Sequence, residues 1–536
     1  MTTPMSAPAN DQPATGASAA EGQAPLDVAT VQMAPVPKAI ATTLLMAATV
    51  LVVLDQTIAT VALPHMQAAL GATPDTISWV LTSYIMATAV ATPLTGWMSG
   101  RFGRTRLFGV CVLGFTISSA LCGLAVTLPM MVASRLAQGF FGAFLMPMSQ
   151  SIIYDLNPPS QQVRAITIWG LGAMAGPMIG PVLGGYLTEM FNWRWVFFIN
   201  VPIGIVAAIG IFALLPKFPS LARSFDHVGF ILVAVALCSL QLALDRGTQQ
   251  DWLDSTEIII ELGLCAAAFW MLIIHLRAAR HPIISISLFR NRTFVVAMIL
   301  AMTVIPTIIA ATALLPSILQ VLLGYPVTTA GEMLIPRSIA LMVSLIAGGR
   351  LMSYLDARLI VSVGISFLAV SLWMQSGFNL LMDPYYIIIA GVLQGLGAGL
   401  AATIVNYLAV SAVPVELRTE AAAMFGLFRS TGGAILITMS TALLARNIQI
   451  NHEEIGAAIS ATNPNLLLAQ SYGGTYFSER LAALADAEVT RQAMMVAYIN
   501  DFWLMMWLMI LMIPIVFLIK PLKRTRAGRP LMAAGE

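Results

Sequence analysis

The stretch Gly172-Ala-Met-Ala-Gly176-Pro177-Met-Ile-Gly180-Pro181-Val-Leu-Gly184-Gly185 lies inside an apolar run that is long enough to cross a bilayer. Its glycines recur every four residues, so they form one smooth stripe along a helix, and a second helix can approach that stripe closely. The two prolines each remove a backbone donor and predict a bend there. Two interpretations are open: a tight packing groove, or a joint that seals or flexes as helices move.

The composition is that of an integral membrane protein. Of the 536 residues, 58% are hydrophobic and only 10% are charged, whereas a soluble protein carries roughly a quarter charged residues. The net charge of +2 is too small to indicate a nucleic-acid partner. The four cysteines have unrelated spacings and the five histidines are scattered, so we expect no metal site and no disulfide framework. Without a Walker-type loop, we expect neither ATP nor another cofactor, and no enzymatic activity.

Fourteen segments are candidates to span the membrane, because each supplies about 20 mainly apolar residues. They lie near 39–62, 78–99, 106–126, 130–154, 165–187, 194–215, 227–244, 257–276, 294–322, 330–352, 358–378, 385–413, 420–445 and 500–520. An even number of spans places both ends of the chain on one side. The prediction is an all-α membrane protein.

Basic residues decide which side that is. Alternate loops carry Lys38, Arg101, Arg104, Arg106, Arg164, Lys217, Arg223, Arg277, Arg280, Arg290, Arg292, Arg350, Arg358, Arg418 and the cluster from Lys520 to Arg529. The opposite loops hold few basic residues, so both termini are predicted to be cytoplasmic. The long segment 446–499 then lies outside, and Tyr476–Tyr498 within it predicts an amphipathic helix.

The two halves of the chain resemble one another. Gly96-Trp-Met-Ser-Gly-Arg101-Phe-Gly103-Arg104 follows the second span, and Gly348-Gly-Arg350-Leu-Met-Ser-Tyr-Leu-Asp356-Ala-Arg358 follows the tenth. A Gln-Gly pair comes at a similar interval after each, at Gln138-Gly139 and at Gln394-Gly395. Such marks indicate duplication of a multi-helix unit. The expected organisation is a disordered cytoplasmic tail (1–37), a six-helix bundle (38–216), a two-helix insert with its loops (217–292), a second six-helix bundle (293–520) and a basic cytoplasmic tail (521–536).

Four charged residues lie inside predicted spans, where each costs about 2.5–3.5 kcal/mol on insertion scales. Asp55 and Arg135 fall at a similar depth, roughly 10 Å below the outer surface at 1.5 Å per residue. We predict that they face one another or one cavity. A carboxylate that alternates between a basic partner and a water-filled cavity would change its pKa and carry a proton. The alternative is a static salt bridge.

The second half has Gly391 at the position of Arg135, judged from the Gln-Gly pairs, so proton coupling is expected only in the N-terminal bundle. Arg337 and Arg429 either face a central cavity from the other bundle or, for Arg337, extend to the membrane surface. Gln56 and Tyr84 are further candidates for the cavity wall. The basic loop after the second span is an orientation signal, and its arginines are also candidates for a cytoplasmic gate.

Several motifs together resemble one family of membrane transporters. Leu54-Asp55-Gln56-Thr57-Ile58-Ala59-Thr60-Val61-Ala62-Leu63-Pro64 resembles its first-span motif, and Arg135-Leu-Ala-Gln138-Gly139 its fourth-span motif for proton coupling. Gly172–Gly185 resembles the fifth-span antiporter motif, and Trp193–Gly204 the sixth-span signature. The loop after the second span resembles the shared gating motif, with Gly100 where an acid is usual. Leu244-Asp245-Arg246-Gly247 is similar to one branch of the family.

These motifs, in this order, resemble the major facilitator superfamily and in detail its fourteen-span EmrB/QacA-type drug:proton antiporters. The resemblance implies proton coupling by Asp55, Arg135 and Gln138. It implies an antiporter motif at Gly172, Gly176, Pro177, Gly180, Pro181, Gly184 and Gly185. It implies a cytoplasmic gate that includes Gly96, Arg101, Gly103, Arg104, Arg350 and Arg358.

The predicted function is proton-driven export of hydrophobic or amphipathic drugs or toxins across a bacterial cytoplasmic (inner) membrane by alternating access. The expected partners are the lipid bilayer, protons, hydrophobic small molecules and, through the EmrB branch, a periplasmic membrane-fusion adaptor protein. Two alternatives are open: a proton-coupled symporter that imports a small solute, and a membrane sensor without transport. If the protein is an exporter, as predicted, we expect Gly172–Gly185 to form a bent seam between the two bundles that seals or flexes during transport and binds nothing itself.

Overall fold

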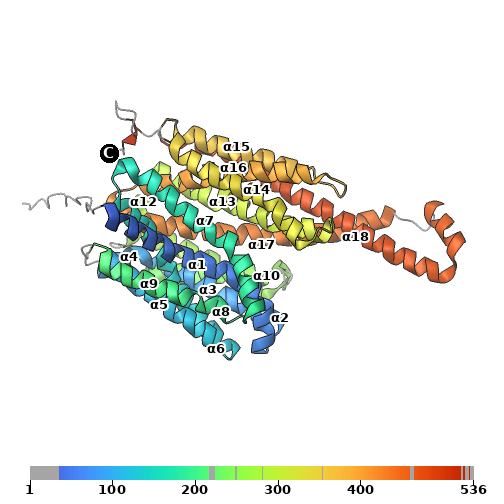
Figure 1. Ribbon diagram of the computed structural model, residues 1–536, viewed down its shortest axis with the longest axis horizontal. Coiled ribbons are helices and arrows are strands. Elements are labelled where there is room, and N and C mark those ends of the chain that lie inside the picture. The colour runs from blue at the N-terminus through green and yellow to red at the C-terminus, as the bar shows by residue number, and fades with distance from the viewer. Residues whose placement is uncertain are drawn as a thin grey trace, which may run out of the picture.

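The computed structural model describes residues 35–520 except 217–223, 248–249, 251, 280–281, 353 and 459–463, together with residues 523–524 and 530–531. Most of the predicted N-terminal tail (1–37) and C-terminal tail (521–536) lies outside the described residues. The described chain is almost entirely helical, and its long helices run roughly side by side along the longest axis of the molecule (Figure 1).

The first half contains nine helices among the described residues. They are α1 (Pro35–Leu70), α2 (Pro74–Ile77), α3 (Trp79–Ala91), α4 (Leu94–Phe102), α5 (Arg104–Leu124), α6 (Leu128–Leu156), α7 (Pro159–Met190), α8 (Trp195–Phe198) and α9 (Asn200–Leu214). Local chemistry sets their ends. The chain turns between α4 and α5 at Gly103, whose φ of +79° favours glycine. The Thr127 hydroxyl caps α6 by accepting from the Met130 amide.

The remainder contains the insert and the second group of long helices. The elements are α10 (His227–Gly247), η1 (Trp252–Asp254), α11 (Thr256–Ala278), α12 (Ile286–Arg290), α13 (Arg292–Ser317), the π-helical turn η2 (Ile318–Leu322), α14 (Val327–Leu351), α15 (Ala357–Gln375), α16 (Pro384–Ser411), η3 (Val415–Leu417), α17 (Arg418–Ala458), α18 (Pro464–Val516), and the strands β1 (Lys523–Arg524) and β2 (Pro530–Leu531). Side chains of Asn291, Asp356 and Asp383 cap α13, α15 and α16.

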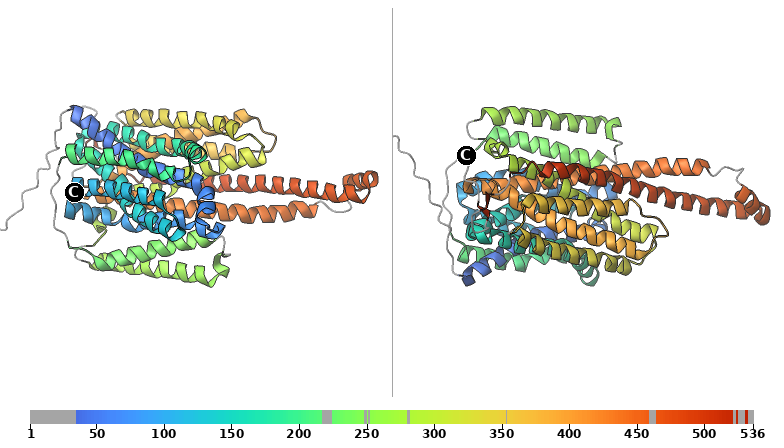
Figure 2. Two further views of the ribbon diagram at one scale, coloured as in Figure 1. Left: turned by 60° about the horizontal axis from the view of Figure 1, so that its bottom comes forward. Right: turned by 90° about the horizontal axis from the view of Figure 1, so that it is seen from above.

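The long helices form two groups that lie side by side, the first below and the second above in Figure 1. In the first, α1 packs on α7, and α6 packs on α3 and α5; in the second, α16 packs on α14 and α15, and α13 packs on α17. The groups meet where α6 contacts α17 and where α7 contacts α14. Helices α10 and α11 pack on each other beside the two groups (Figure 2), and α10 also contacts α3.

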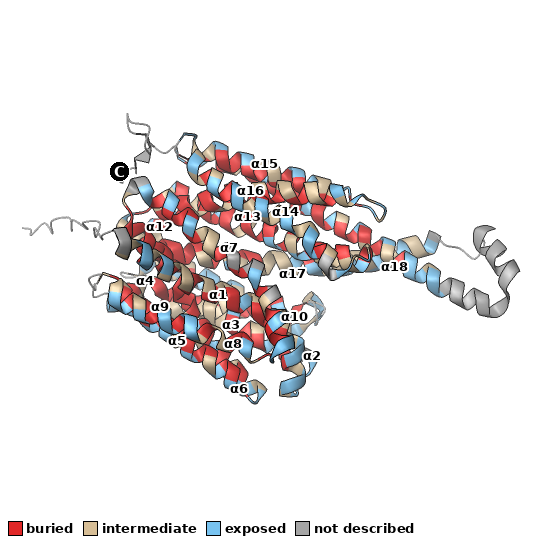
Figure 3. Ribbon diagram, in the orientation of Figure 1, coloured by how far each residue is buried: buried red, intermediate tan, exposed pale blue. Residues whose placement is uncertain are grey.

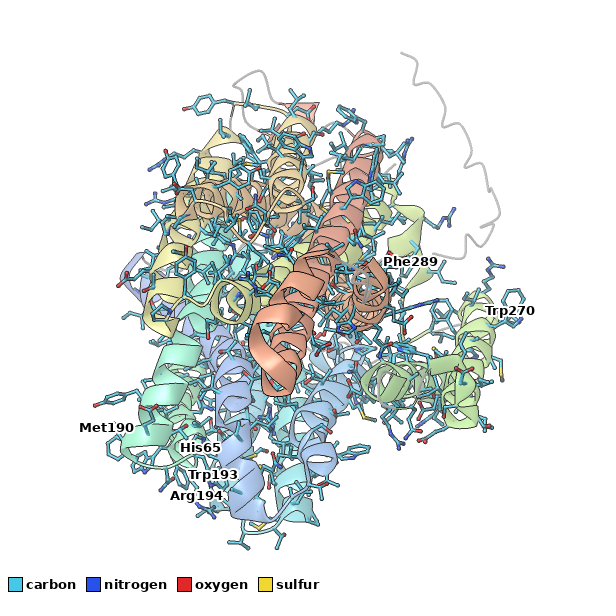
Figure 4. The ribbon with its side chains drawn as sticks, turned by 90° about the vertical axis from the view of Figure 1, so that its right-hand side faces the viewer. His65, Met190, Trp193, Arg194, Trp270 and Phe289 are labelled. Carbon is cyan, nitrogen blue, oxygen red and sulfur yellow. The ribbon has the colours of Figure 1, made fainter. Side chains whose placement is uncertain are left out.

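Burial follows the arrangement expected in a bilayer. Buried residues face the centre of each group and apolar residues remain on the periphery (Figure 3), as Ile117 and Trp270 do with 60% and 68% of their surface exposed. A lipid environment stabilises such surfaces, whereas water would not. In Figure 4, Trp270 points away from both helix groups at the outer edge of α11.

Twelve helices of the described chain are long and apolar enough to cross a membrane. The remaining two predicted spans fall on α3 with α4, which divide near Pro93, and on the 32-residue helix α7. The all-helical membrane fold is therefore confirmed. The count of fourteen spans, the cytoplasmic position of both termini and the domain boundaries stay predictions.

The segment 446–499, whose external position stays a prediction, is helical over most of its length. Helix α17 continues through Ala458, and α18 already begins at Pro464 and runs for 53 residues, about 80 Å at 1.5 Å per residue. The two helices project together beyond the rest of the molecule (Figures 1 and 2). Asn451 Nδ2 donates to the Ala493 carbonyl at 3.3 Å, which ties the two projecting segments together. The predicted helix Tyr476–Tyr498 is part of α18.

Candidate functional site

A buried ion pair joins α1 and α6. The predicted contact is present: Arg135 Nη1 donates to Asp55 Oδ2 at 2.7 Å. The Asp55 side chain is fully buried and that of Arg135 is 1% exposed. Two charges at this depth are tolerated because each offsets the cost of burying the other.

Two amides complete the coordination of the Asp55 carboxylate. Gln138 Nε2 and Asn200 Nδ2 both donate to Oδ1, at 2.8 and 3.1 Å. Arg135 Nη1 also donates to Gln138 Oε1 at 2.8 Å. Helices α1, α6 and α9 thus meet at one carboxylate. Arg135, Gln138 and Asn200 each donate a hydrogen bond to this carboxylate, and the bond from Arg135 is charge-assisted.

The guanidinium of Arg135 is held from its other sides as well. Its Nε donates to the Val80 carbonyl at 3.0 Å, and its Cζ lies 4.3 Å from the centre of the Tyr84 ring. Tyr84 is therefore part of the wall around the ion pair, as a cation–π partner. Gln56, the residue next to Asp55, is exposed rather than part of this buried network.

The glycine stripe of α7 packs against α1, the helix that carries Asp55. A Cβ atom at Gly172 would overlap Met46, one at Gly176 would lie 2.9 Å from Val53 Cγ1, and one at Gly184 would lie 3.2 Å from Ile58 Cγ2.

At Gly180 the added atom would overlap the Thr57 hydroxyl, two residues from Asp55. Only glycine permits this close approach.

This packing corrects one prediction about the stripe. The seam formed by Gly172, Gly176, Gly180 and Gly184 lies within the first helix group and not between the two groups, because its partner α1 belongs to the same group. Helix α7 meets the second group elsewhere, where Gly349 on α14 packs on Thr167. A Cβ atom at Gly185 would have nothing within 4 Å, so this glycine takes no part in the packing. The side chains of Pro177 and Pro181 lie outside the described residues.

A second ionic cluster ties the two helix groups together at the end of the molecule where α4 and α5 meet. The Asp155 carboxylate at the end of α6 pairs with Arg104, and its Oδ1 lies 3.6 Å from Arg418 Nη1 at the start of α17. Beside it, the hydroxyls of Ser151 and Thr419 are 2.7 Å apart. The acid that pairs with Arg104 is therefore on α6.

Of the other predicted gate residues, Gly96 contacts the second helix group, whereas three arginines form no ion pair among the described residues. A Cβ atom at Gly96 would lie 3.1 Å from Glu420 Cβ, so this glycine allows α4 to contact α17. Glu420 in turn accepts from Ser285 Oγ at 3.0 Å, which brings in the segment after the insert. By contrast, Arg101, Arg350 and Arg358 form no ion pair within the described part of the chain, and the first two are exposed.

The two arginines of the second group differ from Arg135. Arg337 on α14 donates through Nη2 to the Thr312 hydroxyl on α13, and its buried Nε has no partner among the described residues. Arg429 on α17 reaches Met146 Sδ on α6 at 3.0 Å. Neither has a carboxylate within ion-pair distance in the described chain. Both side chains are half-buried.

Asp226 caps α10, the first helix of the insert. Its Oδ1 accepts from the Gly229 amide at 2.8 Å and contacts His275 Nε2 at 2.8 Å, while Oδ2 accepts from the Ile283 amide at 3.1 Å. Burial raises the pKa of this carboxyl, but the hydrogen bonds outweigh burial and hold the pKa below its ordinary value. Asp226 therefore joins both insert helices to the segment that follows them.

Asn200 and Asp155 were not among the predicted site residues. Asn200 lies in the sixth-span signature Trp193–Gly204, where a lone amide in an apolar span was the only available signal. Asp155 ends the fourth span, and nothing in its spacing points to Arg104. The described residues contain no group of His, Cys, Asp and Glu side chains that could hold a metal ion.

Several known proteins are similar to this chain. The model of the Major Facilitator Superfamily matches residues 45–437. Multidrug export protein EmrB of Escherichia coli (strain K12) is 30% identical, over 88% of this chain and 94% of that protein. Fatty acid resistance protein FarB of Neisseria gonorrhoeae is 32% identical, over 88% of this chain and 93% of that protein.

A solved structure of the proton:xylose symporter XylE aligns with a TM-score of 0.60 at 11% identity, over 92% of this chain and 98% of that chain, and so shares the fold. The match to the family model covers most of the helical chain, from the helix that bears Asp55 to the one that bears Arg429. The chain belongs to the major facilitator superfamily and is a multi-pass membrane transporter.

Proposed function

We propose that the protein is a proton-driven antiporter that exports hydrophobic or amphipathic drugs or toxins across a bacterial cytoplasmic membrane. The observation that carries this proposal is the buried carboxylate of Asp55 with its donors Arg135, Gln138 and Asn200. The donors come from two further helices, α6 and α9, and one of them is a guanidinium. Protonation of Asp55 would therefore change the hydrogen bonds that join helices α1, α6 and α9.

In the proposed cycle, a proton from the outer side reaches Asp55 and removes the negative charge that holds Arg135. The guanidinium is then buried without its partner, a state that costs several kcal/mol for a fully buried pair. This cost favours a rearrangement of α1 against α6 and α9, in which substrate leaves and the proton later passes to the inner side. In this cycle Asp55 carries the proton, and its hydrogen-bond donors Arg135, Gln138 and Asn200 respond to the change in its charge.

Two other regions support alternating access. The glycine stripe of α7 is a smooth track on which α1 can move without side chains interlocking, which suits the antiporter role of Gly176 and Gly180. The cluster of Arg104, Asp155 and Arg418 closes one end of the molecule by contacts between the two helix groups, and such contacts can break and re-form. We propose that this end is cytoplasmic.

The relatives favour export as the direction. EmrB is named a multidrug export protein and FarB a fatty acid resistance protein, whereas the symporter XylE shares the fold alone. The alternative of a proton-coupled importer uses the same helices and the same acid. The alternative of a sensor without flux does not require a charge network that can release a proton.

Efflux of a fluorescent dye from everted membrane vesicles tests the proposal. A proton gradient should drive the dye into vesicles that contain the wild-type protein, and D55N should abolish that transport. D245N is the matched control, because Asp245 is an exposed acid on α10 whose Oδ1 accepts from Gln241 outside the network. Undiminished transport by D55N, or transport of the dye in the opposite direction, would refute the proposal.

We also propose that the projecting segments of α17 and α18 are where a periplasmic adaptor protein binds. They extend beyond both helix groups at the end opposite the Arg104 cluster (Figure 1), so they would reach past the outer membrane surface. Replacing residues 453–485 by a short linker, which spares the buried residues from Val489 to Tyr498 and joins positions that are already close at His452 and Asp486, should abolish resistance in cells but preserve dye transport in vesicles. Full resistance of cells with the shortened protein would contradict this assignment.

A further inference from the structure

The two helix groups repeat one local contact. In the first, a Cβ atom at Gly139 on α6 would overlap the Tyr84 carbonyl of α3; in the second, one at Gly395 on α16 would overlap the Arg337 carbonyl of α14. The same glycine carbonyls accept hydroxyl hydrogen bonds at 3.1 Å, from Thr88 in one group and from Ser344 in the other. Arg337 therefore occupies in the second group the position that Tyr84 has in the first.

In the second group the arginine lies on a different helix from its counterpart in the first. Arg135 precedes Gly139 by four residues, and the residue four before Gly395 is Gly391. A Cβ atom at Gly391 would lie 3.5 Å from Arg337 Cβ. The guanidinium that α6 supplies in the first group is thus supplied by α14 in the second, in the space beside a glycine.

The anion of the second group is missing. Arg135 donates to a carboxylate on α1, the first helix of its group, whereas Arg337 donates to the Thr312 hydroxyl on α13, the first long helix of the second group. A hydroxyl satisfies one donor and leaves the positive charge uncompensated. Arg337 Nε is buried without a partner, and no carboxylate of the described chain is within ion-pair distance.

We propose that Arg337 and Thr312 bind the head group of an amphipathic organic anion, such as a carboxylate or a sulfonate, which takes the place that Asp55 fills in the first group. A guanidinium can donate two parallel hydrogen bonds to such a group, and a hydroxyl can donate a third. The apolar part of the molecule suits the surrounding apolar helices. This inference deepens the proposed function and rests on it, because it names the class of exported compound.

Competition binding to the purified full-length protein in lipid nanodiscs tests the inference without any proton gradient. The probe is 11-(dansylamino)undecanoate, and the competitors are decanoate, decylamine and decanol, which share one tail and differ in head group. The wild-type protein should bind decanoate at least about tenfold more tightly than decanol or decylamine. R337M should remove that preference, and R337K should retain part of it because it keeps the charge.

A variant of Thr312 gives the sharpest control. T312D supplies the missing carboxylate from within the chain, so it should abolish the preference for decanoate, whereas the neutral and similarly sized T312N should keep it. T312D should also unfold at a temperature no lower than T312N, which excludes misfolding as the cause. Equal competition by decanoate and decanol in the wild type, or unchanged preference in T312D, would overturn the inference.

The outcome is distinguishable from failure of the proposed function. Binding through Arg337 by a protein that shows no gradient-driven flux would refute proton-driven export and support the anion site. Gradient-driven flux without any preference for anions would refute the anion site alone.

Discussion

Replacing Gly180 by leucine should stop transport while the protein still reaches the membrane. A Cβ atom at this position would lie 2.8 Å from Thr57 Cβ and would overlap the Thr57 hydroxyl. That hydroxyl cannot easily turn away, because it donates to the Leu54 carbonyl at 2.9 Å and contacts the Val53 carbonyl at 3.1 Å. Helix α1 must therefore move away from α7.

The size of the effect follows from these distances. Ordinary carbon contacts are about 3.5–4.0 Å, so the helices must separate by roughly 1 Å to accept even the Cβ atom. Overpacking of this kind costs about 1–3 kcal/mol, which lowers the free energy of unfolding but leaves a folded protein. Because Asp55 is two residues from Thr57, the same movement shifts its carboxylate relative to Arg135 and Gln138.

The assay combines dye transport in everted vesicles with the amount of protein in the membrane fraction. G185L is the matched control, since it adds the same side chain to the same helix at a position where nothing lies within 4 Å. The smaller replacement G180A should also reduce transport, and adding T57A to it should partly restore transport. The two residues are in contact, so the effects of the two substitutions should not be additive. Normal transport by G180L, or equal loss in G185L, would refute the reasoning.

Two further predictions concern the ends of the helices. D155N leaves the guanidinium groups of Arg104 and Arg418 without their carboxylate, and Arg418 lies in the second helix group. The contact between the two groups should therefore weaken by roughly 1–3 kcal/mol, and a cysteine at Ser151 should be alkylated faster; an unchanged rate would contradict this contribution of Asp155. A carboxyl whose pKa is lowered on folding stabilises the protein above its unfolded pKa of about 3.9 and loses this effect as pH falls through the folded pKa. The pKa of Asp226 is lowered in this way, so acidification should lower the unfolding temperature of the wild type. D226N keeps one acceptor for His275 but carries no charge, so its unfolding temperature should fall less on acidification. An equal fall in both proteins would contradict this role of Asp226.

The sequence predicts the Asp55–Arg135 pair because a helix rises by a fixed distance per residue. Depth below the membrane surface can therefore be counted along each span, and two opposite charges at one depth are candidates for a pair. Asn200 lies on a third helix and carries no charge, so counting depth gives no reason to select it. Only the packing of α9 on α1 and α5 brings its amide to Asp55.

Partners of a surface are harder to predict than the surface itself. The spacing of Gly172 to Gly184 predicts that some helix approaches closely, but a glycine stripe is equally suited to any smooth neighbour. The structure selects α1, within the same helix group.

In the same way, the acid that pairs with Arg104 is Asp155, 51 residues away in the chain. Contacts of this kind depend on tertiary packing, which residue spacing does not contain.

The most direct test of the central claim, that Asp55 carries the coupled proton, is proton movement measured together with substrate movement in proteoliposomes that contain a trapped pH indicator. A gradient of a transported dye should drive protons in the opposite direction through the wild-type protein. D55N should still exchange dye for dye across the membrane but should move no protons. Proton movement of normal size through D55N would contradict the account.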